Sequence, residues 1–184
     1  MMRQVSRRSF WVALALAPCG CGEAPKAQVV QAAPMAAVDV GYELRRLRPR
    51  DEEKLEAMFD RLRVAAVGEG KRVAVLFSAD WCEPCRKLET ELGNRHPAQQ
   101  IGDVRIFELK EEDWKAATRM DEFDALRQRW SGDTGAYPLL VLLDEKGGKR
   151  EEMKEAITRL EAAKVEPTLA RWFADTRPGR RGAQ

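Results

Sequence analysis

The residues of this chain whose types and spacing could carry out chemistry are its four cysteines, which fall into two pairs. Cys82 and Cys85 form a Cys-x-x-Cys motif, whereas Cys19 and Cys21 lie close to the N-terminus. Thiols three residues apart can exchange electrons with another disulfide, close a structural disulfide, or bind a metal ion. A zinc site needs four ligands, and beyond the motif the chain offers only His96 and the N-terminal pair, so we expect no metal. A structural disulfide would close too short a loop to stabilise much, so redox chemistry is favoured.

The position of the motif predicts a reactive first thiol and a shielded second thiol. The apolar run 73–77 predicts a strand buried on both faces, and the polar stretch 83–92, which stops at Gly93, predicts a helix. Unpaired N–H groups at a helix N-terminus stabilise a thiolate, so we expect a lowered pKa and solvent access for Cys82. Cys85 lies one turn further into the helix, where it can attack the sulfur of Cys82 but is shielded from outside.

Elements that could position this motif alternate between strand and helix along the chain, which predicts an α/β sandwich with a central mixed sheet flanked by helices. Asp51 is expected to cap the first helix, and Pro167 to lie in the first turn of the last one. The expected elements are a helix over 51–66, the strand over 72–79, a strand with alternating polarity over 104–109, one amphipathic helix over 114–130, a buried strand over 139–143, an edge strand over 149–153 after a turn at Gly147-Gly148, and a final helix from 167.

Length and charge bound the organisation of the chain. Its 184 residues suit one domain, expected at 49–176, with a flexible Ala-, Pro-, Gln- and Val-rich tether at 22–48 and a basic tail at 177–184. The net charge of +2 comes from three arginines within residues 1–21, and the rest of the chain carries a net charge of −1. This balance argues against a nucleic-acid partner. The runs of acids and bases at 51–54 and 108–113 are expected to form solvated faces.

The active-site segment of the thioredoxin superfamily resembles Phe77-Ser78-Ala79-Asp80-Trp81-Cys82-Glu83-Pro84-Cys85. The resemblance to this family covers about residues 50–175. Tyr137-Pro138, before the strand at 139–143, matches the cis-proline loop of that family. The resemblance implies a thioredoxin-like sandwich, a cis bond before Pro138, and Tyr137 beside Cys82. It further implies that Trp81, Tyr137 and Pro138 bind the substrate, with the backbone next to Pro138 pairing with an extended segment.

Two departures from the thioredoxin pattern affect the chemistry. Thioredoxins commonly bury an acid six residues before the first cysteine, where this chain has Leu76. Glu89, one helical turn after Cys85, is the candidate substitute, and the alternative is a solvated surface residue.

Ala-Asp-Trp-Cys together with Glu89 is similar to the periplasmic C-terminal domain of DsbD-type thiol reductases, and Cys-Glu-Pro-Cys also occurs in membrane-tethered reductases that serve cytochrome c maturation. Glu83 opposes the helix field at Cys82, which favours a reductant over an oxidant.

The N-terminus predicts export from the cytoplasm. Basic residues followed by the short apolar run 10–17 are typical of an export signal, since eight residues cannot span a bilayer. Ser6-Arg7-Arg8-Ser9-Phe10 resembles a twin-arginine signal, and an ordinary secretory signal is the alternative. Cys19 and Cys21 are placed like the lipidated cysteine of a bacterial lipoprotein, with Cys21 favoured because Gly20 precedes it. Pro18 disturbs both patterns, which leaves plain cleavage as the alternative.

Together these observations predict an exported thiol–disulfide oxidoreductase that reduces protein disulfides through Cys82 and Cys85. The expected setting is the bacterial periplasm, with a lipid anchor as one form and a monomer as the expected state. No dissociable cofactor is needed, but turnover needs an electron donor, for which a membrane thiol carrier is expected. Two alternatives remain open, namely a tethered binding module that uses the cysteines little and a thiol-based copper chaperone.

Overall fold

The structure is a computed structural model that describes residues 39–41, 43–93, 95–97, 103–132 and 136–177. The helices are α1 (Leu55–Gly68), α2 (Glu83–Gly93), α3 (Glu111–Ala116), α4 (Met120–Gln128), α5 (Met153–Ala162) and α6 (Leu169–Asp175). The strands are β1 (Asp39–Gly41), β2 (Glu43–Arg46), β3 (Arg72–Ser78), β4 (Arg95–Pro97), β5 (Val104–Lys110), β6 (Leu139–Leu143) and β7 (Lys149–Glu152). No helix among these residues is long and apolar enough to cross a membrane.

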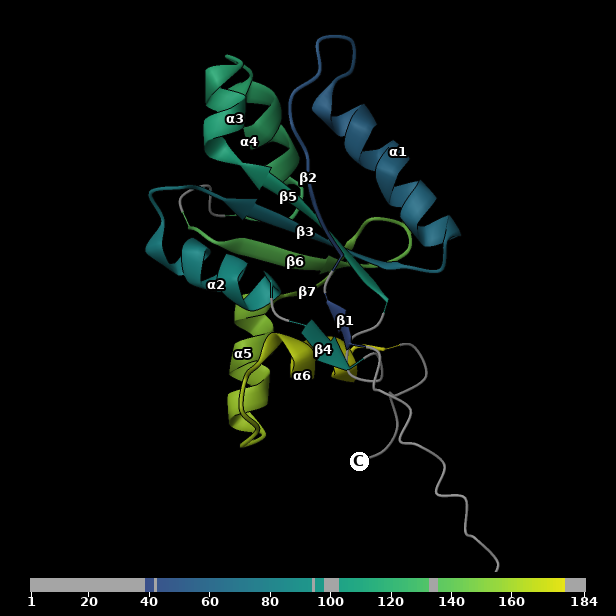
Figure 1. Ribbon diagram of the computed structural model, residues 1–184, viewed down its shortest axis with the longest axis vertical. Coiled ribbons are helices and arrows are strands. Elements are labelled where there is room, and N and C mark those ends of the chain that lie inside the picture. Colours follow the sequence, from purple (N-terminus) through teal and green to yellow (C-terminus); the bar gives the residue numbers. More distant parts are fainter. Residues whose placement is uncertain (1–38, 42, 94, 98–102, 133–135, 178–184) are drawn as a thin grey trace, which may run out of the picture. The chain divides into compact units, whose positions relative to one another are not determined.

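Five strands form one mixed sheet in the order β2-β5-β3-β6-β7 (Figure 1). β5 runs parallel to both β2 and β3, whereas β6 is antiparallel to β3 and β7. β1 and β4 pair separately as a short antiparallel ladder. β3 therefore lies in the middle of the sheet, which explains why all seven of its residues are buried.

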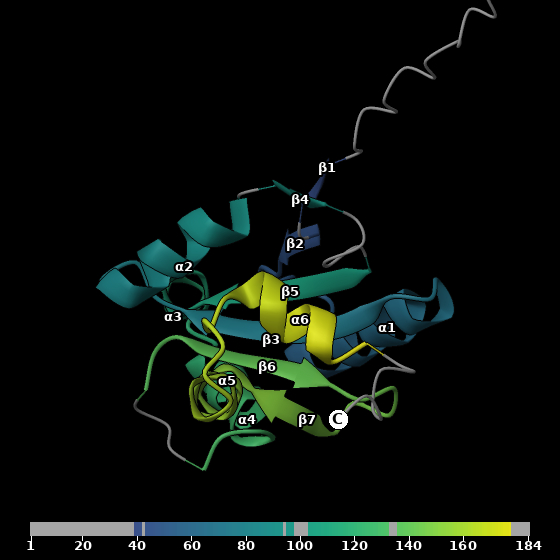
Figure 2. The ribbon, with the colours of Figure 1, turned by 90° about the horizontal axis from the view of Figure 1, so that it is seen from below.

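Helices cover both faces of the sheet and enclose two apolar cores (Figures 1 and 2). Helices α1, α3 and α4 bury Phe59, Trp114 and Phe123 against one face. Helices α2, α5 and α6 bury Leu88 and Trp172, among others, against the opposite face. Successive residues of β3 alternate between the two cores, as the pleat of a strand requires. The α/β class and the mixed, helix-flanked sheet that the sequence predicts are thus confirmed.

Several element predictions are wrong in instructive ways. The helix predicted over 114–130 is two helices, α3 and α4, separated by Thr118 in the left-handed region at φ 54°. Trp114 and Phe123 are both fully buried in the same core. Nine residues make about two and a half helical turns, so a continuous helix would place these two rings on opposite sides.

The first and last helices begin later than predicted. α1 starts at Leu55, because Glu122 of α4 accepts the backbone N–H of Leu55 at 2.8 Å, while Asp51 lies in a turn. α6 starts at Leu169, and the hydroxyl of Thr168 accepts the N–H of Arg171. The cap of α1 comes from a distant element and leaves no local signal in the sequence, whereas Thr168 is a local cap that directly precedes α6.

Four elements lie where the sequence predicts none, namely β1, β2, β4 and α5. β2 falls within 22–48, which was expected to be a flexible tether, yet it pairs with β5 and Leu47 beyond it is buried. α5 was missed, although Glu152 and Glu155 form a reciprocal capping box at its start. β5 itself is buried over its whole length because β2 covers the edge that would otherwise be open.

Candidate active site

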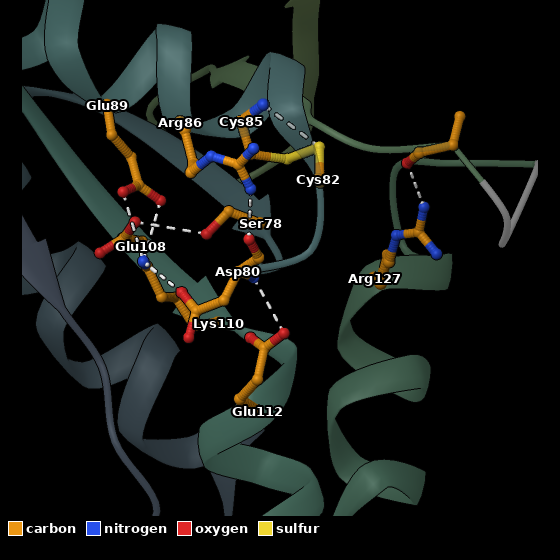
Figure 3. The surroundings of a disulfide bond; sticks show 11 residues. Ser78, Asp80, Cys82, Cys85, Arg86, Glu89, Glu108, Lys110, Glu112 and Arg127 are labelled. Carbon is orange, nitrogen blue, oxygen red and sulfur yellow. Dashed lines mark hydrogen bonds and ion pairs between the residues drawn. A yellow bond between two sulfur atoms is a disulfide. The ribbon is translucent and has the colours of Figure 1, made fainter.

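Cys82 and Cys85 form a disulfide where β3 passes into α2 (Figure 3). The sulfur atoms are 2.11 Å apart and the Cα atoms 5.3 Å apart. The N–H of Cys85 donates to Sγ of Cys82 at 3.2 Å, so the first sulfur receives a backbone hydrogen bond at the start of the helix. Such a donor stabilises negative charge on Cys82 when the disulfide is opened.

Cys82 is more shielded than the sequence predicts, whereas Cys85 is buried as predicted. Cys82, which was expected to be reached by solvent, is 3% exposed, and Cys85 is 1% exposed. Ala79 packs with both cysteines, and Tyr137 packs against this group. Trp81 next to the motif is 64% exposed, so the surface beside the disulfide carries a large apolar ring.

The loop before β6 lies against the disulfide, as the resemblance implies. The Tyr137–Pro138 bond is cis. The ring of Tyr137 meets the edge of Trp81 at 5.5 Å between centroids and lies 4.6 Å from the guanidinium carbon of Arg127. Burial, followed by the negative charge of Glu111, raises the pKa of Tyr137 well above its usual value, so its hydroxyl stays protonated.

Asp80 ties the cysteine loop to the rest of the domain through three separate contacts (Figure 3). Its carboxylate accepts from Nζ of Lys110 at 2.8 Å, its N–H donates to Glu112 at 2.8 Å, and its carbonyl accepts from Arg86 at 2.8 Å. The hydrogen bond from Lys110 lowers the pKa of Asp80. These contacts fix the backbone that leads into Trp81 and Cys82.

Glu89, the candidate acid on α2, points towards Lys110 on β5 (Figure 3). Its carboxylate lies 3.0 Å from Nζ of Lys110, whose side chain is 11% exposed. Burial disfavours the charged form of Lys110, but its hydrogen bonds to Asp80 and Glu89 outweigh that effect and raise its pKa. The side chain of Glu89 is 27% exposed, so it is partly solvated as well as paired with Lys110.

Glu108 on β5 is a buried acid that the sequence reasoning missed. It is 4% exposed, and its carboxylate accepts the hydroxyl of Ser78 at 3.3 Å. Burial raises the pKa of Glu108, and the neighbouring charge of Glu89 raises it further. Glu108 is the register partner of Leu76 on β3, so the acid absent at Leu76 is present one strand away. The prediction that 108–113 forms a solvated face is wrong for Glu108 and Lys110.

A local signal for Glu108 exists in the strand sequence. Polar residues do not alternate strictly in β5, because Arg105 belongs to one face and Glu108 to the other. Glu108 therefore shares a face with Val104 and Ile106, which belong to the core beneath α2. A carboxylate on an otherwise apolar face of a strand indicates a buried acid, which a carboxylate on the polar face of an alternating strand does not.

The described residues offer this site no further metal ligands. The part of the chain that the structure describes contains no group of three or more His, Cys, Asp or Glu side chains that could hold a metal ion. Cys19 and Cys21 lie outside the described residues, as does the whole expected export signal.

A mixed five-stranded sheet with helices on both faces, and a Cys-x-x-Cys disulfide after its central strand, defines a thioredoxin-like fold. The chain matches the model of the thioredoxin-like domain family over residues 59–165, and it belongs to that family. The resemblance seen in the motif is thereby confirmed. Comparison with curated proteins gives no match.

Solved structures similar to the chain are thioredoxin-fold proteins. They include a disulphide isomerase from Xylella fastidiosa Temecula1, with 20% identity, coverage of 70% of this chain and 95% of that chain, and a TM-score of 0.45. Poplar thioredoxin h, PtTrxh4, has 15% identity, coverage of 67% and 98%, and a TM-score of 0.43. The oxidised C-terminal domain of DsbD from Neisseria meningitidis has 20% identity, coverage of 53% and 80%, and a TM-score of 0.39.

Proposed function

We propose that this protein is a thiol–disulfide oxidoreductase that reduces protein disulfides with the dithiol of Cys82 and Cys85. The observation that carries the proposal is the Cys82–Cys85 disulfide at the start of α2, beside the exposed ring of Trp81 and the ring of Tyr137. Family membership supports the same class of activity. A buried disulfide with an apolar surface next to it suits a polypeptide partner.

The reaction transfers two electrons from the dithiol to the substrate disulfide. The thiolate of Cys82 attacks one substrate sulfur, which breaks the substrate disulfide, forms a mixed disulfide and releases the other substrate sulfur as a thiolate that takes up a proton. Cys85 then loses its proton and attacks Sγ of Cys82. The second substrate thiol leaves, and the protein retains the Cys82–Cys85 disulfide.

Glu89 and Glu108 are proposed to receive the proton of Cys85. Glu89 lies one helical turn after Cys85 and faces the sheet, and Glu108 lies below it (Figure 3). A base acts best when its pKa lies near the working pH, and the raised pKa of Glu108 moves this carboxyl in that direction. Lys110 compensates the charge of the pair.

The direction of electron flow is proposed to be towards the substrate. Glu83 begins α2 directly after Cys82, and a carboxylate there opposes the helix field that stabilises the thiolate. Lys87 pairs with Glu83 at 2.9 Å, but both side chains are strongly exposed, so the compensation is weak. A measured reduction potential as high as about −120 mV, typical of strong oxidases, would contradict this direction.

The test of the proposed activity is the reduction of insulin by dithiothreitol in the presence of the protein. We expect the wild-type chain to accelerate the appearance of insulin precipitate, and Cys82→Ser to lose this acceleration. Cys85→Ser is the matched variant, because it retains the first attack and lacks the resolving thiol. A wild-type protein no faster than Cys82→Ser would leave the fold as a binding module and refute the proposal.

We further propose that the protein works in the bacterial periplasm and takes electrons from a membrane thiol carrier. The support lies in the basic residues and the apolar run 10–17 at the N-terminus, and in Cys19 and Cys21, which follow that run. Mass spectrometry of the mature N-terminus tests the anchor. An acylated Cys21 or Cys19 would support it, whereas an unmodified N-terminus beyond Cys21 would show that the protein is released without one.

A further inference from the structure

Arg127 of α4 is a buried cation placed directly behind the loop that faces the disulfide. The residue is 1% exposed. Its guanidinium donates a hydrogen bond to the carbonyl of Ala136 (Figure 3). The guanidinium carbon lies 4.6 Å from the ring centroid of Tyr137. Burying a guanidinium is costly unless its charge and donors are matched. We therefore ask what its contacts with the loop achieve that an apolar side chain would not.

Tyr137 connects this cation to the cysteines. One side of its ring receives Arg127, its edge-to-face partner is Trp81, and it packs against Cys82 and Cys85. The three side chains form a series from the exposed indole of Trp81 to the buried guanidinium of Arg127. Any movement of the loop from Ala136 to Pro138 would therefore change the surface beside the sulfur that a substrate must reach.

We propose that Arg127 is a positioning residue that holds Ala136–Pro138 ready to receive an extended polypeptide, and that it makes the site selective for polypeptide disulfides over small-molecule disulfides. This inference rests on the proposed oxidoreductase function and deepens it. A loop fixed before binding spares the substrate the cost of ordering it, and its backbone groups can pair with an extended chain. A small disulfide has no chain to pair and needs access to Cys82 alone.

The chemistry of arginine suits this task better than that of other cations. A planar guanidinium can stack on a ring and donate to a carbonyl at the same time, whereas the ammonium of lysine is a point charge. Arg129, two residues further along, also stacks on a ring, that of Trp130 at 5.0 Å, but it is exposed. Arg129 therefore provides a matched arginine that makes a similar contact away from the loop.

The experiment compares two substrates of the full-length protein, insulin and 2-hydroxyethyl disulfide, with dithiothreitol as the electron donor and the uncatalysed rate subtracted. The proteins compared are the wild type, Arg127→Met, Arg127→Lys and Arg129→Met. We expect Arg127→Met to raise KM for insulin about thirtyfold, the equivalent of one desolvated cation–π contact, with kcat changed less than twofold. Its rate with 2-hydroxyethyl disulfide should stay within about twofold of the wild type. Arg127→Lys should have a KM for insulin about threefold lower than that of Arg127→Met. Arg129→Met should match the wild type.

Several outcomes would overturn the inference without touching the proposed activity. If Arg127→Met lost equal activity with both substrates, Arg127 would act on the reactivity of the cysteines and not on the binding of a polypeptide. If its KM values were unchanged, the loop would need no support from Arg127. If Arg127→Met fails to fold, Arg127→Lys carries the same comparison, because it keeps the charge. A wild-type protein that reduces neither substrate would instead refute the oxidoreductase function itself.

Discussion

Replacing Glu108 with glutamine should stabilise the oxidised protein at neutral and alkaline pH and leave it unchanged at acidic pH. The carboxyl of Glu108 is buried in the core beneath α2, and burial together with the charge of Glu89 raises its pKa. Lys110, Arg46 and the hydroxyl of Ser78 act in the opposite direction without cancelling this rise. The folded protein thus favours the protonated acid more than the unfolded chain does. Glutamine resembles that acid in size and in lacking charge.

The sign and size of the effect follow from proton linkage. The pKa of a glutamate in the unfolded chain is about 4.3. Below this pH the folded and unfolded states both carry the proton, so Glu108 does not lower the free energy of unfolding. As the pH rises towards the higher pKa of the folded state, the unfolded chain releases its proton first and is stabilised by about 1.4 kcal/mol per pH unit. Glu108→Gln removes this loss, which is large against a total stability of about 5–15 kcal/mol.

Urea unfolding of the oxidised wild type and Glu108→Gln between pH 4 and pH 8 measures this difference. Glu161→Gln is the matched control, because Glu161 is exposed on α5. We expect the two main curves to coincide near pH 4 and to separate as the pH rises, with Glu108→Gln the more stable. A difference that does not depend on pH, or a less stable Glu108→Gln at pH 8, would refute the reasoning.

Three further predictions concern the other acids of the site. Glu89→Gln should slow resolution of the mixed disulfide by about tenfold and leave the first attack unchanged, because a proton acceptor acts only on Cys85; equal single-turnover rates would contradict this. Asp80→Asn should lower the Tm at pH 7 and have little effect near pH 2, because the stabilisation from the lowered pKa of Asp80 is present above its unfolded pKa and lost as the pH falls through the folded one. A pH-independent change in Tm would contradict it. Glu83→Gln should raise the reduction potential by about 10–30 mV in a glutathione equilibrium, and a lower potential would reverse the assignment.

Local pattern predicted the part of the fold that surrounds the motif. β3, α2 and β6 are where the sequence places them, because two continuous apolar runs can only be central strands and the motif separates a strand from a helix. The turn at Gly147-Gly148 and the edge strand β7 are equally local features. The disulfide and the position of Tyr137 beside it agree with what the motif and the resemblance imply.

The sequence did not predict the features that depend on pairing across the fold. β2 looks like part of a linker until its pairing with β5 is known, and the break between α3 and α4 is visible only when Trp114 and Phe123 share a core. Glu108 is buried because β5 lies inside the sheet, and Arg127 meets Tyr137 from a different element. The charged side chains that surround the disulfide were thus the least predictable part of the site.

Trapping of a mixed disulfide tests the central claim, that Cys82 attacks and Cys85 resolves, most directly. Reduced Cys85→Ala is mixed with an excess of a peptide that contains one disulfide, and the intact mass is measured after quenching with acid. Every protein compared also carries Cys19→Ser and Cys21→Ser, so that the mass reports on Cys82 and Cys85 alone. We predict one covalently attached peptide chain on Cys82, none on Cys82→Ala, and no accumulating adduct on the wild type, which should instead release reduced peptide and contain the Cys82–Cys85 disulfide. An adduct on Cys85 in the Cys82→Ala protein, or no adduct on Cys85→Ala, would contradict the account.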